Sequence, residues 1–364
     1  MTGHRRVLVT PRDSNPYQSL LYRELALLGW DVRYSEGPTP SQTINVALKP
    51  FVLMLYRLRG FRILHIHWVY DFGLEWAGDR KWARMLLQGW FGLYLRTARA
   101  LGYSIVWTAH NLVPHRTVFH NDIAARRDLV RQAGAVIALN ETTVNDLKLL
   151  GADRIAVVPC GSYGALYPMD FTKIEARTEL GIAHDEIVML LIGKLAPYKG
   201  ADHLIASMNA VRTDHRVRAV IAGECNTDAY RLHLRALCEF AEGVTLIARH
   251  LADHEMGLYL RAADFAVLPF IAVTNSSSVL LVAASGLPLI LPNHTDLLGV
   301  PTTASVRYDE TDPRGLARAL ERCTEIDEQQ RDEMARCATE YGASFDWATA
   351  GAATSGIYLE LIAS

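Results

Sequence analysis

Two lysines flank a short loop in the second half of the chain, in the segment IGKLAPYKGADHLI. The apolar run before this loop predicts a buried strand that ends at Gly193, and a helix is expected to begin near Gly200. Gly193 permits a ligand to approach the backbone closely, while Lys194 and Lys199 bring two cations to the carboxyl edge of a parallel sheet. Two ammonium groups beside a helix N-terminus suit a diphosphate. The pattern therefore predicts a diphosphate site, and the alternative is a pair of solvated loop lysines.

A run of five polar residues interrupts an apolar segment farther along the chain, within FIAVTNSSSVLLVAASGLPLI. The run consists of Thr274, Asn275, Ser276, Ser277 and Ser278. One residue of this kind is enough to cap the helix that the following residues predict. Five of them leave spare hydroxyls and backbone N–H groups at the positive end of the helix, which favours an anion. We expect the run to form a second wall of the diphosphate site, and an over-long helix cap is the alternative.

Histidines gather at the ends of two predicted strands in the first half, in ILHIHWVYD and WTAHNLVPHR. They are His65, His67, His110 and His115, and Asp71 follows the first of these strands. Metal ligation by four histidines is conceivable, but no cysteine joins them. Histidine and aspartate at strand ends serve equally well as acid/base or hydroxyl-binding groups, although a lone histidine is more often structural. We expect a general base here, with Asp71 and His110 as first choices and His67 and His115 after them.

The elements that must position these residues follow one scheme from end to end, because short apolar runs alternate with longer helical patterns. Strands are expected at 5–10, 30–35, 63–69, 104–110, 135–140, 155–159, 187–194, 217–223, 243–248, 265–270 and 287–292. Helices are expected at 19–29, 81–102 and 141–151, with helical spacing again at 314–323 and 345–361. The first strand does not lead into a G-x-G-x-x-G loop, which disfavours dinucleotide binding there. The scheme predicts an α/β protein with two Rossmann-like sheets and a hinge around 159–168.

Composition excludes several classes of protein. The 364 residues carry a formal net charge of −2 and no sustained basic block, so nothing favours a nucleic-acid partner. The five cysteines are scattered and never spaced as CxxC, which indicates neither a disulfide framework nor a zinc site. Neither a signal-peptide run nor a membrane-spanning run is present, so we expect a cytoplasmic protein.

Together these segments resemble a GT-B glycosyltransferase, most closely the family 4 (glycosyl transferases group 1) enzymes that use sugar nucleotides. IGKLAPYKG resembles the donor-domain motif G-[RK]-x4-K-G, and IAGE, YLRAADFAVLPF and SGLPLILP follow it in the expected order. VPCGSYGALYP resembles the interdomain V-P-x-G segment, and FDWATAGAATSGIYLEL resembles the closing F-x-W…Y helix. HIHW resembles the family's H-x-H strand end, whose second histidine, His67 here, lies near the reacting sugar in such enzymes.

The resemblance implies two Rossmann-like domains that face each other across a cleft. Residues 1–164 would bind the acceptor, together with a crossover helix at 345–364, and residues 165–344 would bind the donor. Lys194 and Lys199 would be ligands of the diphosphate of a UDP- or GDP-linked sugar. Two lysines and a helix dipole can replace a metal ion, so we expect neither a metal nor another cofactor.

The chain departs from the resemblance at two glutamates that retaining family 4 enzymes carry eight positions apart. Counting back from the S-G-L-P segment, these positions hold Val273 and Leu281. The polar run 274–278 becomes a candidate replacement for the missing donor contacts. Without the two carboxylates the donor identity stays open, and an inverting displacement with a base from the first domain is at least as consistent with the sequence as retention.

Two segments bear on the acceptor, because ALKPFVLMLYRLRGFR and KWARMLLQGWFGLYLR combine aromatic and aliphatic residues with cations. The cations are Lys49, Arg57, Arg59, Arg62, Lys81, Arg84 and Arg96. Basic amphipathic helices can lie in a membrane interface, whereas core-packing helices with solvated basic faces look similar. The first alternative predicts a peripheral protein at the inner face of the plasma membrane, with a lipid-linked saccharide of a surface polysaccharide pathway as acceptor. The second leaves a soluble saccharide or natural-product glycoside.

We therefore expect a hexosyltransferase that moves a sugar from a UDP- or GDP-sugar to an acceptor hydroxyl. Two alternatives stay open at this point. A GT-B nucleotide-sugar epimerase would act on the donor without an acceptor, and a non-catalytic sugar-nucleotide-binding partner would account for the missing glutamates.

Overall fold

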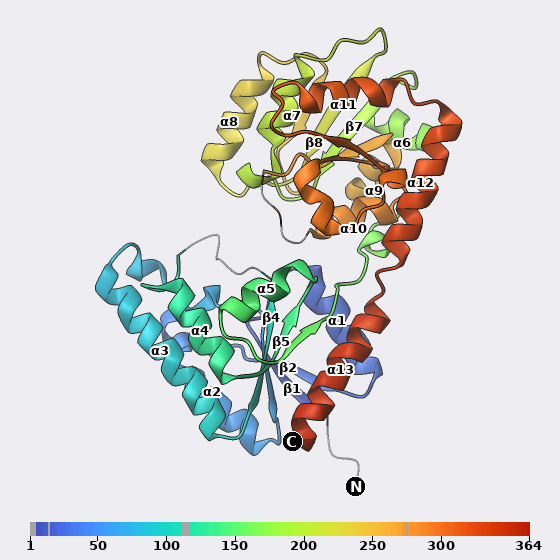
Figure 1. The fold of residues 1–364 in the computed structure, drawn as a ribbon. Helices are drawn as coiled ribbons and strands as arrows, with labels where there is room; N and C mark the ends of the chain where they lie inside the picture. Colours follow the sequence, from blue (N-terminus) through green and yellow to red (C-terminus); the bar gives the residue numbers. More distant parts are fainter. Residues whose placement is uncertain (1–4, 14, 111–116, 272, 274–275) are drawn as a thin grey trace. The chain divides into compact units, whose positions relative to one another are not determined.

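The computed structural model describes the chain apart from residues 1–4, 14, 111–116, 272 and 274–275. The chain divides into two compact units, which Figure 1 shows as two sheets flanked by helices. The first unit comprises Met1–Gly161 and Asp346–Ser364, and the second comprises Ser162–Phe345.

The first unit is built on a parallel sheet whose described strands run in the order β2-β1-β3-β4-β5-β6. The strands are β1 (Arg6–Thr10), β2 (Asp31–Tyr34), β3 (Ile63–Ile66), β4 (Ser104–Ala109), β5 (Ala133–Ala138) and β6 (Ile155–Val157). The helices are α1 (Pro16–Leu27), α2 (Gln42–Leu58), α3 (Lys81–Ala100), α4 (Asp122–Gln132) and α5 (Thr142–Leu149), with 3₁₀ turns η1 (Tyr70–Phe72) and η2 (Glu75–Ala77). The strand order reverses between β1 and β3, and ligands of open α/β sheets bind beyond the carboxyl ends at such a reversal.

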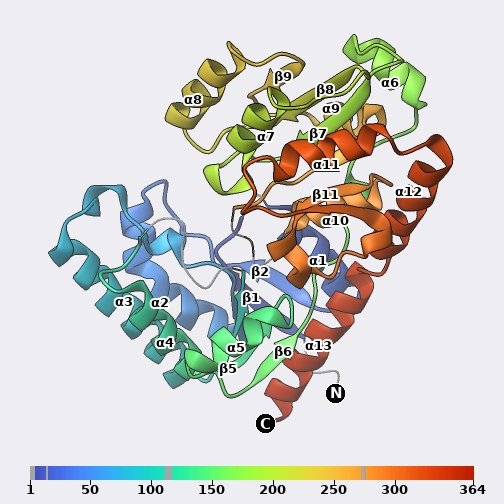
Figure 2. The same ribbon diagram turned by 45° about the horizontal axis from the view of Figure 1, so that its top comes forward.

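The C-terminal helix α13 (Trp347–Ala363) packs on α1 of the first unit, as Figure 2 shows. A Cβ atom at Gly351 would lie 2.6 Å from Cβ of Glu24, so the absence of a side chain lets the two helices approach closely. The indole Nε1 of Trp30 donates to Oγ of Ser355 at 2.9 Å, and the ring of Trp30 lies 4.9 Å from that of Tyr358. The predicted return of the last helix to the N-terminal domain is therefore confirmed.

The second unit repeats the architecture with the described strand order β12-β11-β10-β7-β8-β9, again parallel. The strands are β7 (Ile187–Ile192), β8 (Val217–Ala222), β9 (Val244–Ile247), β10 (Phe265–Val267), β11 (Leu289–Pro292) and β12 (Ser305–Tyr308). The helices are α6 (Lys173–Leu180), α7 (Ala201–Met208), α8 (Asp228–Cys238), α9 (Asp253–Ala262), α10 (Ser277–Ala284), α11 (Gly315–Thr324) and α12 (Glu328–Ala343). The 3₁₀ segments are η3 (Gly164–Leu166), η4 (Pro197–Lys199), η5 (Asn293–Leu298) and η6 (Thr302–Ala304). Here the strand order reverses between β7 and β10.

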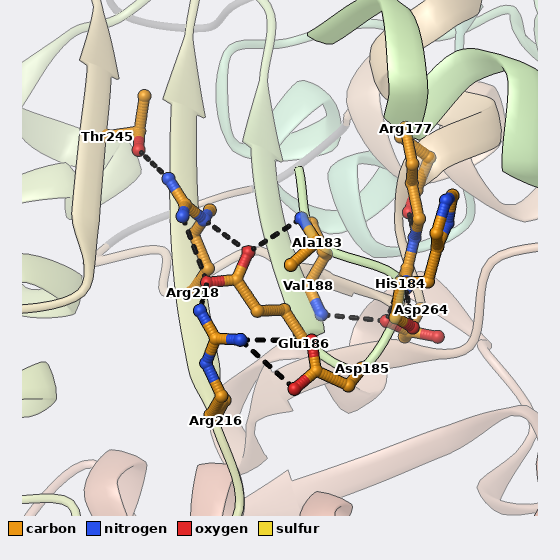
Figure 3. A network of polar contacts seen from close by, with 11 residues as sticks. Arg177, Ala183, His184, Asp185, Glu186, Val188, Arg216, Arg218, Thr245 and Asp264 are labelled. Atoms are coloured by element: carbon orange, nitrogen blue, oxygen red, sulfur yellow. Dashed lines mark hydrogen bonds and ion pairs between the residues drawn. The ribbon is translucent and has the colours of Figure 1, made fainter. Parts of the chain in front are cut away.

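A buried ion-pair network lies at the amino-terminal edge of the second sheet, where β7 and β8 begin (Figure 3). Asp264, which is 5 % exposed, accepts hydrogen bonds from Nη2 of Arg177 at 2.6 Å and from the backbone N of Val188 at 2.7 Å. The carboxylate of Glu186 accepts hydrogen bonds from Nε and Nη2 of Arg218, at 2.8 and 2.9 Å. Because charges this deeply placed must be paired to be tolerated, the network fixes the strands at the edge opposite to their carboxyl ends.

Candidate functional site

The turn after β7 brings three of the predicted donor-site residues together. Gly193 has φ of +108°, in the region that favours glycine, and a Cβ atom built there would lie 3.6 Å from both Nζ of Lys199 and Oγ of Ser278. Nζ of Lys199 donates to Oγ of Ser278 at 2.8 Å. The site thus lies at the carboxyl end of β7, beside the reversal of strand order.

Close backbone packing pins this turn in place. Gly200 has φ of +71°, and a Cβ atom at this position would lie 2.0 Å from the carbonyl oxygen of Pro269, just beyond β10. The backbone N of Ile271 donates to the carbonyl of Tyr198 at 2.9 Å. The turn that carries Lys199 is therefore fixed against the segment that leads to α10.

Lys199 is a buried cation, with 9 % of its surface exposed. Burial, reinforced by the nearby charge of Lys194, lowers the pKa of the Lys199 ammonium to about 8. Its described neighbours supply the hydroxyl of Ser278 and a second cation, but no carboxylate raises its pKa. A bound anion would supply the missing counter-charge. Lys194 itself is exposed at the start of the turn.

The described serines of the polar run divide their roles at the start of α10. Ser276 is the N-cap, and its side chain accepts from the backbone N of Val279 at 3.4 Å. Ser277 is exposed, whereas Ser278 is buried against Lys199. Capping therefore accounts for only one of the three. Thr274 and Asn275 lie outside the described residues.

The two positions at which the resemblance expects glutamates differ in burial. Leu281 is buried in α10 with 6 % of its surface exposed, while Val273 is partly exposed just before the run. Neither side chain offers an oxygen to a ligand. Among the described residues, α10 itself therefore offers polar side-chain atoms at this end from Ser276, Ser277 and Ser278, next to Nζ of Lys199.

In the first unit, His67 makes contacts through both ring nitrogens. Its Nε2 lies 2.5 Å from Oη of Tyr22, and its Nδ1 lies 3.0 Å from Nε2 of His110. His110 in turn stacks on Trp68, with ring centroids 4.2 Å apart, and Tyr17 meets it edge-on at 4.6 Å. The structure thus brings two of the predicted bases together, in an aromatic cluster at the carboxyl ends of β3 and β4.

His65 lies two residues before His67, and both of its ring nitrogens also contact protein groups. Its Nε2 lies 2.7 Å from Oγ1 of Thr108, and its Nδ1 meets the hydroxyls of Tyr22, at 2.9 Å, and of Tyr358 on α13. Tyr22 and Tyr358 were not predicted to belong to this cluster. They come from α1 and α13, and no local spacing connects them to β3.

Burial keeps these imidazoles neutral. It lowers the pKa of His65 and of His110 to about 3, and it lowers the pKa of His67 well below its usual range, with the two neighbouring histidines adding to the effect. A neutral ring whose two nitrogens both meet protein groups has no free nitrogen to accept a proton from a substrate. The contacts of His67 therefore favour a structural role over that of a base.

Asp71 lies in η1 and forms an ion pair with Lys49 of α2. Oδ2 of Asp71 is 2.6 Å from Nζ of Lys49, which also donates to Oγ1 of Thr10 at the end of β1, at 3.2 Å. Lys49 is 6 % exposed and its Nζ lies 5.1 Å from the ring centroid of Phe72. The prediction of Lys49 as a cation of a solvated amphipathic face is wrong, because it lies on the inner side of α2 with Val46 and Leu53.

A cavity of about 860 Å³ opens beside this ion pair, beyond the carboxyl ends of β1 and β2. Its charged lining residues are Arg12, Asp13, Glu36, Lys49 and Asp71. Asp71 is thus the predicted base that borders a cavity large enough for a sugar ring. His115 lies outside the described residues. Within the described ranges no three His, Cys, Asp or Glu side chains are placed to hold a metal ion.

Residues 186–325, from β7 to the end of α11, match the family model described as Glycosyl transferases group 1. The protein is a glycosyltransferase. The glycosyltransferase is 26 % identical to a D-inositol 3-phosphate glycosyltransferase of Acidothermus cellulolyticus, over 90 % of this chain and 74 % of that protein. It is 25 % identical to a GDP-mannose:glycolipid 4-beta-D-mannosyltransferase of Xanthomonas campestris, over 77 % of this chain and 70 % of that protein.

Solved structures agree with this glycosyltransferase in fold. Sucrose-phosphate synthase from Thermosynechococcus elongatus superposes with a TM-score of 0.78 at 17 % identity, covering 99 % of both chains. HepE of Anabaena, in complex with UDP and glucose, superposes with a TM-score of 0.72 at 16 % identity, covering 97 % of this chain and 99 % of its own. The predicted GT-B class with two Rossmann-like sheets is confirmed.

Proposed function

We propose that the protein transfers a hexosyl group from a UDP- or GDP-sugar to an acceptor hydroxyl. The observation that carries the proposal is Lys199, a buried cation that meets Ser278 at the start of α10 inside the group 1 domain. The likeness in fold to HepE, solved with UDP and glucose, supports a nucleotide-sugar donor. The name of the Xanthomonas relative, which includes GDP-mannose, keeps the guanine nucleotide in the proposal.

The proposed chemistry breaks the bond between the anomeric carbon and the diphosphate and forms a bond from that carbon to the acceptor oxygen. The ammonium groups of Lys199 and Lys194 and the start of α10 would stabilise the charge that develops on the leaving diphosphate. This set of positive groups would serve in place of a metal ion. The acceptor proton would pass to a base in the first unit.

We place Asp71 first as that base, with His110 second. Asp71 is a carboxylate at the edge of a cavity, whereas the ring of His67 makes protein contacts through both nitrogens. Because Val273 and Leu281 supply no carboxylate to the donor, we propose that the displacement inverts the anomeric centre. NMR of the product tests this outcome, and a product with the donor's anomeric configuration would contradict it.

The substitution Lys199→Ala tests the donor assignment. We expect sugar transfer to fall at least about 100-fold, as for the loss of a group that stabilises developing charge. The matched control is Lys148→Ala, which removes an exposed lysine from α5 of the first unit and should leave transfer unchanged. Near-normal transfer by Lys199→Ala with an unchanged melting temperature would sink the assignment. Incubation with the donor alone completes the test. An epimerised sugar nucleotide as product would contradict sugar transfer and favour the epimerase alternative.

The proposed acceptor follows from the outer surface of α2 and α3, two neighbouring helices of the first unit (Figure 2). Large apolar side chains are exposed at helical spacing on both, which we call the apolar face. On α2 they are Ile44, Phe51, Met54, Leu55 and Leu58, and on α3 they are Trp82, Met85, Leu86 and Leu93. Solvent-facing apolar groups gathered in this way indicate an interaction surface.

The charged residues on and beside α2 and α3 indicate which kind of partner the apolar face would bind. Neither α2 nor α3 contains an aspartate or glutamate, although the whole chain has a formal net charge of −2. The exposed cations on or beside the two helices outnumber the exposed acids beside them, Glu75 and Asp79; the cations are Arg59, Arg62, Arg80, Lys81, Arg96 and Arg99. Apolar side chains with basic neighbours match the interface of an anionic bilayer. No helix in the described ranges is long and apolar enough to cross a membrane.

We therefore propose that the protein docks peripherally on the inner face of the plasma membrane and uses a lipid-linked saccharide as acceptor, in polysaccharide biosynthesis. The Xanthomonas relative is named for a glycolipid acceptor, which supports this proposal. Sedimentation with vesicles of anionic phospholipid should pull down the protein, and vesicles of phosphatidylcholine alone should pull down much less.

A pair of matched variants sharpens the vesicle test. Phe51→Glu with Leu86→Glu places two carboxylates in the apolar face and should reduce vesicle binding at least about tenfold, from lost burial of two large side chains. Phe240→Glu changes a side chain that is 82 % exposed in the second unit and should have no effect. Equal binding of all three proteins would refute the membrane proposal and leave a soluble saccharide or glycoside as acceptor.

A further inference from the structure

The cavity at the carboxyl ends of β1 and β2 belongs wholly to the first unit. The turn after β1, the end of β2 and the inner side of α2 enclose it, and Asp71 borders it. Its volume of about 860 Å³ exceeds the needs of a single sugar ring. It therefore has room for a headgroup of one or two rings, and its lining decides which chemistry fits.

The cations of this cavity are already paired with acids of the same cavity. Nη1 of Arg12 lies 2.8 Å from Oε1 of Glu36, and Nζ of Lys49 lies 2.6 Å from Oδ2 of Asp71. Asp13 adds a further carboxylate to the lining, so the described charged groups sum to one negative charge. Phosphate recognition uses cations that are free to form charge-assisted hydrogen bonds. Because a carboxylate neutralises each cation, a phosphate entering here would meet no net positive charge.

The helix end nearest to the cavity is also satisfied. Pro16 occupies the first position of α1 and has no N–H group. The backbone N of Tyr17 donates to Oδ1 of Asn15 at 2.9 Å, and that of Gln18 meets the carbonyl of Asn15 at 3.3 Å. The first turn of α1 thus has no described donor left for an anion, although helix N-termini commonly bind one.

The same wall contains polar atoms that lack a partner among the described residues. Ser35, at the end of β2, is 8 % exposed, and its Oγ forms no hydrogen bond. Oδ1 of Asp71 is likewise buried without a partner, whereas its Oδ2 meets Lys49. Buried polar atoms without partners cost stability, and a ligand hydroxyl can donate to one group and accept from another.

We propose that this cavity receives the acceptor as an uncharged polyhydroxyl ring, a sugar or cyclitol without phosphate, with Ser35 and Asp71 on its hydroxyl groups. The Arg12–Glu36 pair then acts as a specificity element, because Glu36 neutralises the cation that would otherwise attract a phosphate. This inference rests on the proposed function, in which an acceptor hydroxyl binds the first unit.

Binding of two matched probes, myo-inositol and inositol 1-phosphate, tests the inference by ligand-observed NMR on the full chain. The wild-type protein should bind the uncharged ring at least about tenfold more tightly than the phosphorylated ring. Glu36→Gln keeps the shape of the side chain and frees Arg12, so it should reverse this preference by a gain in affinity for inositol 1-phosphate. Glu239→Gln, at an exposed position of the second unit, is the control that should change neither affinity.

Equal or tighter binding of the phosphorylated ring by the wild-type protein would overturn the inference, and so would the absence of binding by both rings. A second measurement separates this failure from that of the proposed function. UDP or GDP should raise the melting temperature of wild type and Glu36→Gln alike, because Lys199 lies in the other unit. If the protein binds nucleotide but does not prefer myo-inositol to inositol 1-phosphate, only the proposal for the cavity is rejected. If the protein does not bind nucleotide, the proposed donor site is rejected.

Discussion

The buried ammonium of Lys199 predicts how the activity toward the donor depends on pH. Burial and the charge of Lys194 lower its pKa to about 8, so the free enzyme loses this cation just above neutral pH. The diphosphate of a sugar nucleotide keeps its charge over the same range. The kcat/KM for the donor should therefore follow the protonated fraction of Lys199 and fall on the alkaline side.

The magnitude follows from the pKa of about 8. At pH 7 about 90 % of the molecules carry the charged lysine, and at pH 9 only about 10 % do. The kcat/KM should thus fall about tenfold between pH 7 and pH 9 and about tenfold more by pH 10. Lys194→Ala removes the neighbouring cation, so it should move the midpoint to higher pH.

Initial rates at limiting donor, measured from pH 6 to pH 10 with a non-titrating acceptor, provide the assay. Lys199→Arg is the decisive variant, because a guanidinium stays charged throughout this range and the alkaline fall should disappear even if the absolute rate is lower. A wild-type profile that stays flat to pH 10, or an unchanged alkaline fall in Lys199→Arg, would refute the reasoning.

Three further predictions concern stability. Because burial lowers the pKa of His65 and of His110 to about 3, and that of His67 well below its usual range, their contribution to stability is complete above the unfolded pKa of about 6.5 and is lost as pH falls. Each histidine should lower the free energy of unfolding, measured by urea denaturation, by about 1.4 kcal/mol per pH unit below pH 6.5, so the wild-type slope should exceed this value, and a flat curve from pH 6.5 to 4.5 would contradict it. Asp264→Ala leaves the guanidinium of Arg177 buried without its partner and should cost about 3–5 kcal/mol in the same assay, against an effect near zero for the exposed Asp228→Ala. Gly200→Ala places a Cβ 2.0 Å from the carbonyl oxygen of Pro269, so it should lower the melting temperature by several degrees, and an unchanged melting curve would show that the turn is not held against the segment after β10.

The parallel fold was predictable because both sheets are covered on both faces, and such strands read as continuous apolar runs. β12 (Ser305–Tyr308) was missed because its four residues include Arg307 and it lies at the edge of its sheet. α12 (Glu328–Ala343) was missed because its sequence is mostly polar, with only Ala338 and Gly342 buried. Short edge strands and polar helices owe their formation to neighbours, which local periodicity does not register.

The candidate sites show the same limit. Gly193, Lys199 and Ser278 could be predicted to lie together because each follows or faces a strand end of one parallel sheet. The partners of the histidines could not, because Tyr358 reaches His65 across 293 positions of sequence. The buried location of Lys49 could have been predicted from the sequence. Its spacing from Val46 and Leu53 places it on the buried stripe of α2 rather than among the exposed cations.

The phase of α2 ties two properties of the protein to one another. Lys49 on its inner side faces Asp71, and Phe51, little more than half a turn farther on, lies on the apolar face. Each residue added to or removed from a helix rotates all later side chains of that helix by about 100°. One residue inserted early in α2 would rotate Lys49 away from the carboxylate of Asp71. The same insertion would rotate the exposed apolar side chains of α2 away from the surface. A change in the length of α2 would therefore alter the Lys49–Asp71 pair and the apolar face together, whereas a substitution can alter either one alone.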